Sequence, residues 1–477
     1  MKHPTLLFLL ILLVGCTSKQ EPAISPVLPI PSASQLAWQQ MEMNMFIHFN
    51  MNTFTNMEWG FGDESPEQFN PTDLDCRQWA SIAKAAGMEG IILTAKHHDG
   101  FCLWPSAYTE HSVKNSPWKN GEGDVVQELR EACEEYGLKL GLYLSPWDRN
   151  HPEYGQPAYI EYYRNQMVEL LSNYGDIFEF WVDGANGGDG YYGGANEPRT
   201  VDRQSYYDWD STFALATQLQ PDVVIFSDAG PGCRWVGNEE GWANPTNWST
   251  LNKEGFFPGT PDYKELTSGH EGGSSWVPAE VNTSIRPGWY YHPEEDTAVK
   301  SLEKLQAIYD HSLGRNGLLL LNMPVDTRGQ IHPNDSARLM ELATWVEIDH
   351  READRITGEI IATNSRGNTY AANHLLDGID STCWAVEDQA ENPSVELTFD
   401  APEEIRLVTI KEAIKFGQRV AEFSVEAKIG GAWTLLHEET TIGYRRMLRN
   451  EPVTAEAIRL TILRSRGPVV LSEFAVF

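Results

Sequence analysis

Histidines and aspartates follow several apolar segments of this 477-residue sequence. His48 ends one segment, His97 and His98 follow a second, and Asp183 and Asp228 each follow a further one. In an α/β barrel the C-terminal ends of the strands meet at one rim, which is where catalytic side chains lie. The sequence therefore predicts that these side chains converge on one site, although they lie far apart along the chain.

Asp183 belongs to the segment FEFWVDGA, residues 178–185. The segment begins as a buried strand and ends in a carboxylate beside Trp181 and before Gly184. A charge in such surroundings is costly unless it is paired or serves a function. Asp183 is therefore a candidate nucleophile, and capping of the next element is the alternative interpretation.

Two chemistries suit these residue types. In the first, histidines and an aspartate hold a metal ion that activates water. Adjacent residues of a strand point to opposite sides, so His97 and His98 are a poor ligand pair, and no HxH spacing occurs. In the second, histidines and aromatic residues bind a sugar while two carboxyl groups catalyse cleavage. The 16 tryptophans, the 18 tyrosines and the net charge of −32 favour the second, and a metallohydrolase stays open.

A retaining glycosidase needs a second carboxyl group as proton donor. The segment RWVGNEEG, residues 234–241, follows the fifth predicted strand and offers Glu239 and Glu240. Their like charges and the neighbouring tryptophan would raise the pKa of one carboxyl toward that of a general acid. A solvated pair of loop glutamates is the alternative.

Apolar periodicity alternates between strands and helices over residues 33–348, which predicts a (β/α)8-like barrel with one or two irregular repeats. A doubly wound open sheet is the alternative, and no GxGxxG motif supports it. Near residue 352 the period changes to two, which predicts a β-sandwich over 352–477. The predicted barrel strands lie at 45–49, 90–94, 138–144, 178–183, 223–226 and 317–322. Residues 277–285 and 288–291 could both carry the sixth strand. The predicted helices lie at 72–87, 124–137, 157–173, 209–219, 298–313 and 337–348.

The N-terminal residues 1–20 are typical of a signal peptide. An apolar run precedes Leu13-Val14-Gly15-Cys16, which resembles a bacterial lipobox with Cys16 as the lipidated residue. Residues 21–32 are then a tether, and the protein is expected to be an exported lipoprotein, periplasmic or at the cell surface. An ordinary secretory signal is the alternative. The negative charge argues against nucleic acid as a partner and against a membrane contact other than the lipid anchor.

The motifs together resemble the α-L-fucosidases of glycoside hydrolase family 29. They are FIHF, EWG, KHHDGF, GLYLSPWD, WVDGA, RWVGNEEG and GLLLLNMPVDTRGQI, which occur in the family's order over about 300 residues. The resemblance implies a retaining exo-α-L-fucosidase that acts on fucosylated glycans without a metal or other cofactor, with Asp183 as nucleophile. It also implies that the following residues bind fucose: His48, Glu58, Trp59, His97, His98, Tyr143, Trp181, Arg234 and Trp289.

The segment RWVGNEEG is similar to the subfamily that prefers α1,3/1,4-linked fucose of Lewis-type glycans, which implies Glu239 as acid/base and Glu240 as second choice. Leu376-Asp377-Gly378 and Thr382-Cys383-Trp384 resemble discoidin-like (F5/8 type C) sandwiches. Structural support of the barrel is the favoured role of the sandwich, over sugar binding. The competing hypothesis is a non-catalytic glycan-binding surface lipoprotein.

Overall fold

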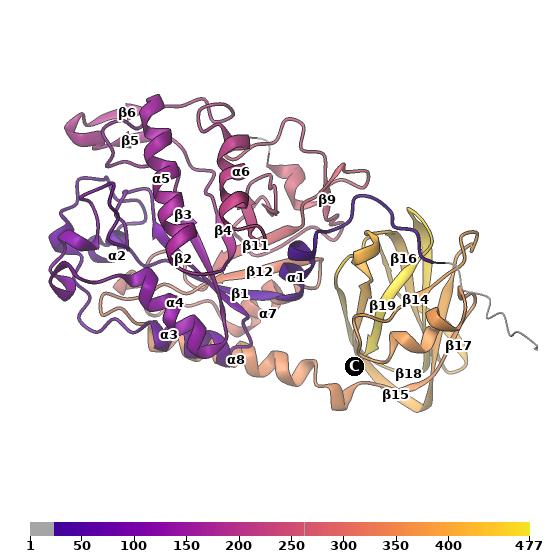
Figure 1. The fold of residues 1–477 in the computed structure, drawn as a ribbon. Helices are drawn as coiled ribbons and strands as arrows, with labels where there is room; N and C mark the ends of the chain where they lie inside the picture. The colour runs from indigo at the N-terminus through magenta and orange to yellow at the C-terminus, as the bar shows by residue number, and fades with distance from the viewer. Residues whose placement is uncertain (1–22, 262) are drawn as a thin grey trace, which may run out of the picture.

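Eight parallel strands close into a barrel in the computed structural model, which describes residues 23–261 and 263–477 (Figure 1). The barrel closes because β1 pairs with both β2 and β12: Met45 lies beside Ile91 on one side and Leu321 on the other. The predicted barrel is confirmed. Its strands are β1 (Met43–Ile47), β2 (Gly90–Lys96), β3 (Lys139–Leu144), β4 (Ile177–Trp181), β7 (Val224–Ser227), β8 (Cys233–Trp235), β11 (Ala279–Ser284) and β12 (Gly317–Asn322).

Helices between consecutive barrel strands, together with one helix that follows the last strand, cover the outside of the barrel. Local sequence explains their ends: Asp124 caps the first turn of α4 by accepting from Gln127 N, and Gly137 ends that helix with a left-handed backbone. The helices are α3 (Cys76–Ala85), α4 (Val125–Tyr136), α5 (Pro157–Asn173), α6 (Trp209–Leu219), α7 (Leu302–Ser312) and α8 (Pro333–Asp349). Helices α5 and α6 have the predicted bounds.

Two connections depart from the regular repeat. A short turn, residues 228–232, joins β7 directly to β8, so residues 233–235 form a strand where the sequence predicted only a loop. The segment from β8 to β11 holds the two-stranded pair β9 (Thr250–Leu251) and β10 (Ser275–Trp276). The predicted strand 277–285 is therefore the seventh of the barrel, and Gly288–Tyr291 is a loop.

The C-terminal domain is antiparallel throughout, as the period of two predicts. Val395, Leu397 and Phe399 alternate with more exposed neighbours and are buried in its core. The sheet order is β14-β19-β15-β18-β16-β17, and β13 pairs with β15. Its strands are β13 (Gly358–Ala362), β14 (Trp384–Ala385), β15 (Ser394–Glu412), β16 (Val420–Ile429), β17 (Ala432–Glu439), β18 (Arg446–Ser465) and β19 (Val470–Val476).

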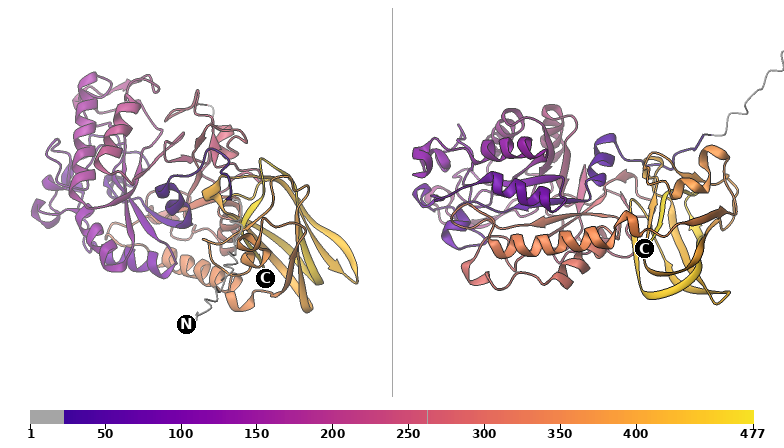
Figure 2. Two further views of the ribbon diagram at one scale, coloured as in Figure 1. Left: turned by 45° about the vertical axis from the view of Figure 1, so that its right-hand side comes forward. Right: turned by 90° about the horizontal axis from the view of Figure 1, so that it is seen from below.

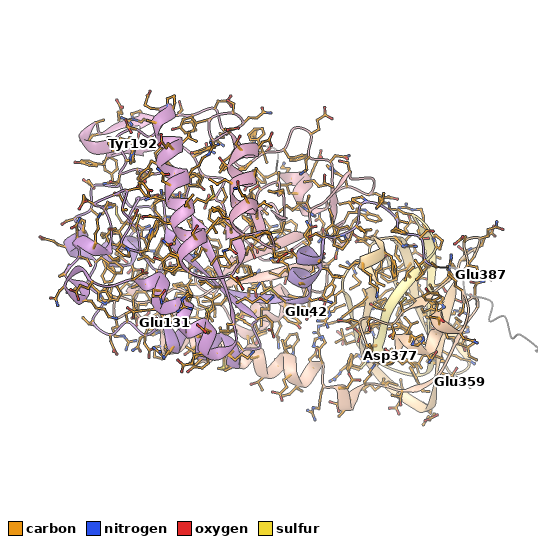
Figure 3. All side chains as sticks on the ribbon, viewed as in Figure 1. Glu42, Glu131, Tyr192, Glu359, Asp377 and Glu387 are labelled. Carbon is orange, nitrogen blue, oxygen red and sulfur yellow. The ribbon has the colours of Figure 1, made fainter. Side chains whose placement is uncertain are left out.

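This domain packs against the N-terminal end of the barrel strands. Glu42, which precedes β1, accepts hydrogen bonds from the Tyr444 hydroxyl at 3.1 Å and from Arg445 at 2.6 Å (Figure 3). Asn316, which precedes β12, accepts from Tyr444 N at 2.7 Å. Figures 1 and 2 show α2 (Met51–Thr55) at the far end of the barrel from this domain. The hairpin of β5 (Gly188–Gly190) and β6 (Glu197–Arg199) lies at the same end.

Residues 23–31 do not form the flexible tether that the sequence predicts, because the C-terminal domain holds them. Val27 N donates to Phe416 O at 2.9 Å, and Arg419 donates to Ser25 O at 2.7 Å. Helix α1 (Ala33–Gln40) then begins at a Ser32 cap and covers the N-terminal end of the barrel. The predicted signal peptide and Cys16 lie outside the described residues. No helix within the described ranges is long and apolar enough to cross a membrane.

Candidate active site

A pocket of about 260 Å³ opens at the C-terminal end of the barrel strands. Most of the residues that the sequence singled out converge on it from separate strand ends, as the barrel requires. The lining residues are Phe46, His48, Glu58, Trp59, His97, His98, Tyr143, Trp181, Asp183, Ala185, Glu239, Asn282 and Trp289.

Asp183 is held at the floor of this pocket by donors to both of its oxygens. The hydroxyl of Tyr143 donates to Oδ2 at 3.0 Å, and the backbone N–H of Ala185 donates to Oδ1 at 2.7 Å. Nε2 of His98 lies 3.9 Å from Oδ2. The Tyr143 hydroxyl and the Ala185 N–H stabilise a carboxylate and fix its orientation, as a nucleophile on a rigid strand end requires.

The turn after Asp183 needs a glycine because of a second buried carboxyl group. A Cβ at Gly184 would come within 2.4 Å of an Asp228 carboxylate oxygen. Asp228 follows β7, accepts a hydrogen bond from Gly259 N at 2.7 Å and is buried, and burial raises its pKa to about 7. Asp228 supports this turn from behind and does not line the pocket.

Glu239 reaches the mouth of the pocket from the loop after β8. Its Oε2 accepts a 3.1 Å hydrogen bond from the indole N–H of Trp289. Although the residue is exposed, desolvation at the pocket mouth raises the pKa of its carboxyl group. The nearby charges of Asp183 and Glu58 act in the same direction, and the Trp289 bond opposes them. A carboxyl group with a raised pKa is suited to donate a proton.

The hydrogen-bond network assigns the tautomer of His48. Its Nδ1 lies 2.8 Å from Oδ1 of Asn322. The Asn322 amide is fixed, because its Nδ2 donates to Trp289 O and to Ser284 Oγ. His48 Nδ1 must therefore carry the hydrogen, which leaves Nε2 as an acceptor. Burial lowers its pKa to about 3, so the ring is neutral at physiological pH.

His98 has the same tautomer for a different reason. Its Nδ1 lies 2.7 Å from Ser145 Oγ, and the Ser145 hydroxyl donates to Trp147 O at 2.7 Å. The serine has one hydrogen, so His98 Nδ1 is the donor and Nε2 is an acceptor. Burial lowers the pKa of His98 to about 4, with the Asp183 charge opposing the shift.

His97 has the opposite tautomer. Nδ2 of Asn52 lies 3.3 Å from its Nδ1, and the Asn52 amide is fixed because its Oδ1 accepts from Gly60 N at 2.9 Å. His97 Nδ1 is thus the acceptor, and Nε2 carries the hydrogen. Burial lowers the pKa of His97 well below its usual range. The three neutral rings offer two acceptors and one donor, a combination that suits a polyhydroxylated ligand.

Glu58 joins the loop after β1 to the loop after β11. Its carboxylate accepts from the backbone N–H groups of Trp289 and Tyr290 at 2.9 and 3.1 Å, and it lies 2.7 Å from Nε2 of His292. A Cβ at Gly288 would come within 2.6 Å of Glu58 Oε1, so only glycine permits this approach. Glu58 therefore sets the position of Trp289, the partner of Glu239.

Trp59 is the outer wall of the pocket. It is half exposed, and its ring meets His98 and Trp147 edge to face at centroid distances of 5.2 and 5.6 Å. An exposed indole over a polar pocket offers an apolar face for a sugar ring or the residue attached to it.

Besides Asp228, two residues named from the sequence lie outside the pocket. Arg234 is on β8 and points away from the barrel interior, where its guanidinium donates to Leu266 O and to Asn247 Oδ1. Glu240 is exposed and accepts from the Trp242 indole at 3.0 Å. Neither lines the pocket, so the structure brings Asp183 together with Glu239 and not with Glu240.

Sequence reasoning missed three lining residues and the residues behind the histidines. Phe46 and Asn282 line the pocket from inward-facing positions of β1 and β11, and Ala185 lines it from the Asp183 turn. A signal for Asn282 exists, because polar residues alternate with Ala279 and Val281 within a buried strand. The amides Asn52 and Asn322, which fix two tautomers, leave no such pattern.

A larger hollow of about 780 Å³ lies at the opposite end of the barrel. It is bordered by α1 and by the residues that precede β3, β4 and β7. None of the catalytic candidates borders it, and its neighbours are mostly aliphatic or surface groups. The small pocket therefore combines what glycoside cleavage needs: two carboxyl groups in different surroundings, hydrogen-bonding rings and aromatic walls.

Comparison with known proteins agrees with this geometry. A family profile described as Alpha-L-fucosidase matches residues 23–351, and one described as F5/8 type C domain matches residues 359–474. Alpha-L-fucosidase 1 of Arabidopsis thaliana is 41% identical over 471 residues, which cover 97% of this chain and 90% of that protein.

Solved structures lead to the same family. A glycoside hydrolase 29 family member from an unknown rumen bacterium is 48% identical, with a TM-score of 0.83 over 95% of this chain and 78% of that one. A Ruminococcus gnavus GH29 fucosidase in complex with fucose is 31% identical, with a TM-score of 0.85 over 96% of both chains. The chain therefore belongs to the α-L-fucosidases of glycoside hydrolase family 29 and carries a C-terminal F5/8 type C domain.

Proposed function

We propose that this α-L-fucosidase is a retaining exo-enzyme that releases terminal fucose from α1,3- or α1,4-linked glycans. Asp183 is the nucleophile and Glu239 the acid/base. The observation that carries the proposal is that Asp183 and Glu239 line one small pocket while Glu240 does not. The donors on both Asp183 oxygens and the raised pKa of Glu239 suit the two roles.

The reaction proceeds in two displacements. In the first, an Asp183 oxygen attacks the anomeric carbon, and Glu239 gives its proton to the departing glycosidic oxygen. This step forms a fucosyl ester on Asp183 and breaks the glycosidic bond. In the second, Glu239 takes a proton from water, the water oxygen attacks the anomeric carbon, and Asp183 leaves as a carboxylate. The released fucose has the configuration of the substrate.

Pocket size supports the exo mode of action. At about 260 Å³ the pocket is smaller than the roughly 300–1,000 Å³ of sites for drug-sized ligands, so it suits one sugar ring. The acceptors on His48 and His98 and the donor on His97 would each meet a hydroxyl of that ring. The sugar that carries the fucose would lie outside, near the exposed ring of Trp59.

The linkage preference rests on the loop that carries Glu239. The segment RWVGNEEG resembles the subfamily that cleaves α1,3/1,4-linked fucose. In this structure Asn238 orders that loop: its Nδ2 donates to Trp242 O at 2.9 Å and its Oδ1 accepts from Glu240 N at 3.1 Å. An ordered acid/base loop at the mouth is a means of selecting branched over linear linkages.

A panel of fucosides tests the proposal. Released fucose is measured with α1,2-, α1,3-, α1,4- and α1,6-linked oligosaccharides, and proton NMR records the anomer that forms first. We expect release from Lewis-type trisaccharides, α-fucose as first product, and much slower cleavage of α1,2 and α1,6 linkages. Initial formation of β-fucose would refute the double displacement, and equal rates on all linkages would refute the preference. Glycan binding without any release would instead support a non-catalytic lipoprotein.

We further propose that the protein is an exported lipoprotein anchored through Cys16. The lipobox-like sequence supports this, and Ala23 lies on the C-terminal domain, where Arg366 contacts its carbonyl oxygen at 3.3 Å. The test is metabolic labelling of the full chain with an alkyne fatty acid in a bacterial host. We expect label in the wild type and none in the Cys16→Ala variant, and label that persists in the variant would refute this site.

A further inference from the structure

Two buried carboxyl groups, Glu179 on β4 and Glu280 on β11, face each other inside the barrel. Both side chains are fully buried, and one oxygen of each lies within 4.8 Å of the other and of the Cys233 sulfur. They lie deeper in the barrel than Asp183, two and four residues before the strand ends, and the mechanism above does not use them.

Each carboxyl group accepts a hydrogen bond from an indole. Trp38 of α1 donates to Glu179 Oε2 at 2.7 Å, and Trp181 donates to Glu280 Oε1 at 2.9 Å. Oε2 of Glu280 is buried and lacks a hydrogen-bond partner as long as both groups are counted as carboxylates. A buried polar atom without a partner is costly, and a proton between the two groups removes the deficit.

The charged surroundings favour a retained proton. Cys233 of β8 is a neutral thiol, because burial and both glutamates raise its pKa. The guanidinium of Arg234, the residue after Cys233, bonds to Leu266 O and Asn247 Oδ1 and not to either glutamate. No lysine or arginine of the described residues forms an ion pair with Glu179 or Glu280. Two negative charges without a cation cannot both persist in a dry interior.

The hydrogen-bond donors around each group determine which of the two glutamates holds the shared proton. Glu179 accepts from Trp38, and the Cys233 thiol lies 3.7 Å from its Oε1, so two groups already stabilise negative charge there. Glu280 has one donor only. Burial raises the pKa of both groups, to about 7 for Glu179 and well above the usual range for Glu280. The proton therefore resides on Glu280 Oε2 and points at Glu179.

Trp181 connects this pair to the pocket. Its ring stacks on Phe226 at 3.9 Å and on Tyr143 at 5.1 Å, and Tyr143 is the donor to Asp183. The indole N–H on Glu280 is the one hydrogen bond that fixes the rotation of this ring. A displaced indole would shift both the pocket wall and the Tyr143 hydroxyl.

We propose that Glu280 and Glu179 form an acid–carboxylate pair that shares one proton and acts as the positioning element for Trp181 and, through Tyr143, for Asp183. This inference rests on the proposed roles of Trp181 and Asp183. It assigns a role in the reaction to two groups that touch neither the substrate nor the reacting atoms.

Substitutions at Glu280 test whether activity depends on an acceptor for Trp181 and a donor for Glu179 at this position. Glutamine keeps one acceptor for Trp181 and one donor for Glu179, so Glu280→Gln should retain at least half of kcat/KM. Glu280→Leu leaves the Trp181 indole without an acceptor and removes the proton shared with Glu179, which keeps only its bonds from Trp38 and Cys233. Accordingly, kcat/KM should fall roughly 10- to 100-fold, the scale of a misplaced contact. If the leucine variant keeps wild-type kcat/KM, or if a folded glutamine variant loses as much as leucine, the proposal is wrong.

A double-mutant cycle separates positioning from general destabilisation. Trp181→Phe removes the indole N–H, so adding Glu280→Leu to it should lower kcat/KM by less than about threefold. Equal losses from Glu280→Leu in both backgrounds would show that the glutamate does not act through Trp181. The Asp183→Asn variant is run beside them: if it stays active, the proposed nucleophile fails, whatever the result at Glu280.

The shared proton has its own signature in the pH dependence of stability. A carboxyl group whose folded pKa is raised stabilises the fold less as pH rises from its unfolded value through its folded value. Glutamine lacks this titration, so Tm of Glu280→Gln minus Tm of the wild type should increase between pH 5 and pH 8. A constant difference contradicts the shared proton. One equivalent of zinc in the purified wild type, absent from Glu280→Gln, would show a metal site instead.

Discussion

The Tyr143 hydroxyl lies 3.0 Å from Oδ2 of Asp183, on the side opposite the backbone N–H that holds Oδ1. The carboxylate is therefore fixed at both oxygens in the pocket that it lines. A carboxylate held in this way is suited to attack the anomeric carbon and not to act as the proton donor.

Replacing Asp183 should abolish turnover while preserving the pocket. Asp183→Asn keeps a similar shape but has no nucleophile, so kcat should fall by roughly 10³-fold or more. With Asp183→Gly and an activated aryl fucoside, added azide should restore turnover and give β-fucosyl azide, which NMR identifies. Asp189→Asn, at an exposed carboxylate of the nearby β5–β6 hairpin, is the matched control. Near-normal turnover in Asp183→Asn would refute the nucleophile.

Substitutions of the adjacent Glu239 and Glu240 should have very different effects on activity. Glu239→Gln removes the proton donor, so kcat/KM on a Lewis-type trisaccharide should fall by roughly 10²- to 10⁴-fold. A dinitrophenyl fucoside, whose leaving group needs no protonation, should lose much less in the first step. Glu240→Gln should stay within about twofold on both substrates, as an exposed substitution outside the pocket. A larger loss of kcat/KM in Glu240→Gln than in Glu239→Gln would identify Glu240 as the acid/base.

The Trp289 indole should tune the alkaline limit of activity. Its N–H stabilises the charged form of Glu239 and so lowers the pKa of that carboxyl group. Trp289→Phe removes this bond, the pKa rises, and the proton donor persists to higher pH. The alkaline limb of the kcat/KM profile should therefore move up by about 0.5–1 unit, since one hydrogen bond is worth about 1 kcal/mol.

Trp242→Phe is the control for that profile. Its indole donates to Glu240, which does not line the pocket, so the alkaline limb should stay in place. A downward shift in Trp289→Phe, or equal shifts in both variants, would contradict the assignment of Glu239.

The junction between the two domains should contribute to stability without affecting catalysis. Arg449 of β18 pairs with Asp310 and Asp349, which lie on α7 and α8, and its guanidinium stacks on Trp345. Arg449→Met should cost about 1–3 kcal/mol of unfolding free energy, measured by denaturant titration, with kcat/KM unchanged. Arg77→Met should cost less than about 1 kcal/mol, because its ion pair with Glu135 is exposed and lies within the barrel domain. If both variants lost the same unfolding free energy, the contacts of Arg449 would stabilise the protein no more than an exposed ion pair does.

The strand ends were predictable because each carries its own local signal. A buried apolar run followed by a histidine or an aspartate places His48, His97 and Asp183 on the rim as soon as a barrel is assumed. Helices α5 and α6 were found at their observed bounds, since both have apolar spacing and clear ends. Convergence of these residues on one pocket followed from topology alone.

Contacts across the barrel were not predictable in the same way. β8 has only three residues and follows β7 after a short turn, so the sequence predicts a loop at Arg234. On a strand its side chain alternates to the outside, which removes it from the pocket. The pairing of Glu179 with Glu280 depends on which inward positions share a layer of the closed barrel, and neither local sequence contains that information.

The C-terminal domain lies at the N-terminal end of the barrel strands, and residues 23–31 run across it before α1 begins. Its strands add no residue to the rim of the pocket. If the polypeptide is attached to a surface through its N-terminal part, this domain becomes a spacer between that surface and the catalytic mouth. Bulky glycoconjugates in the surrounding fluid would then reach the enzyme without steric interference from the layer that holds it.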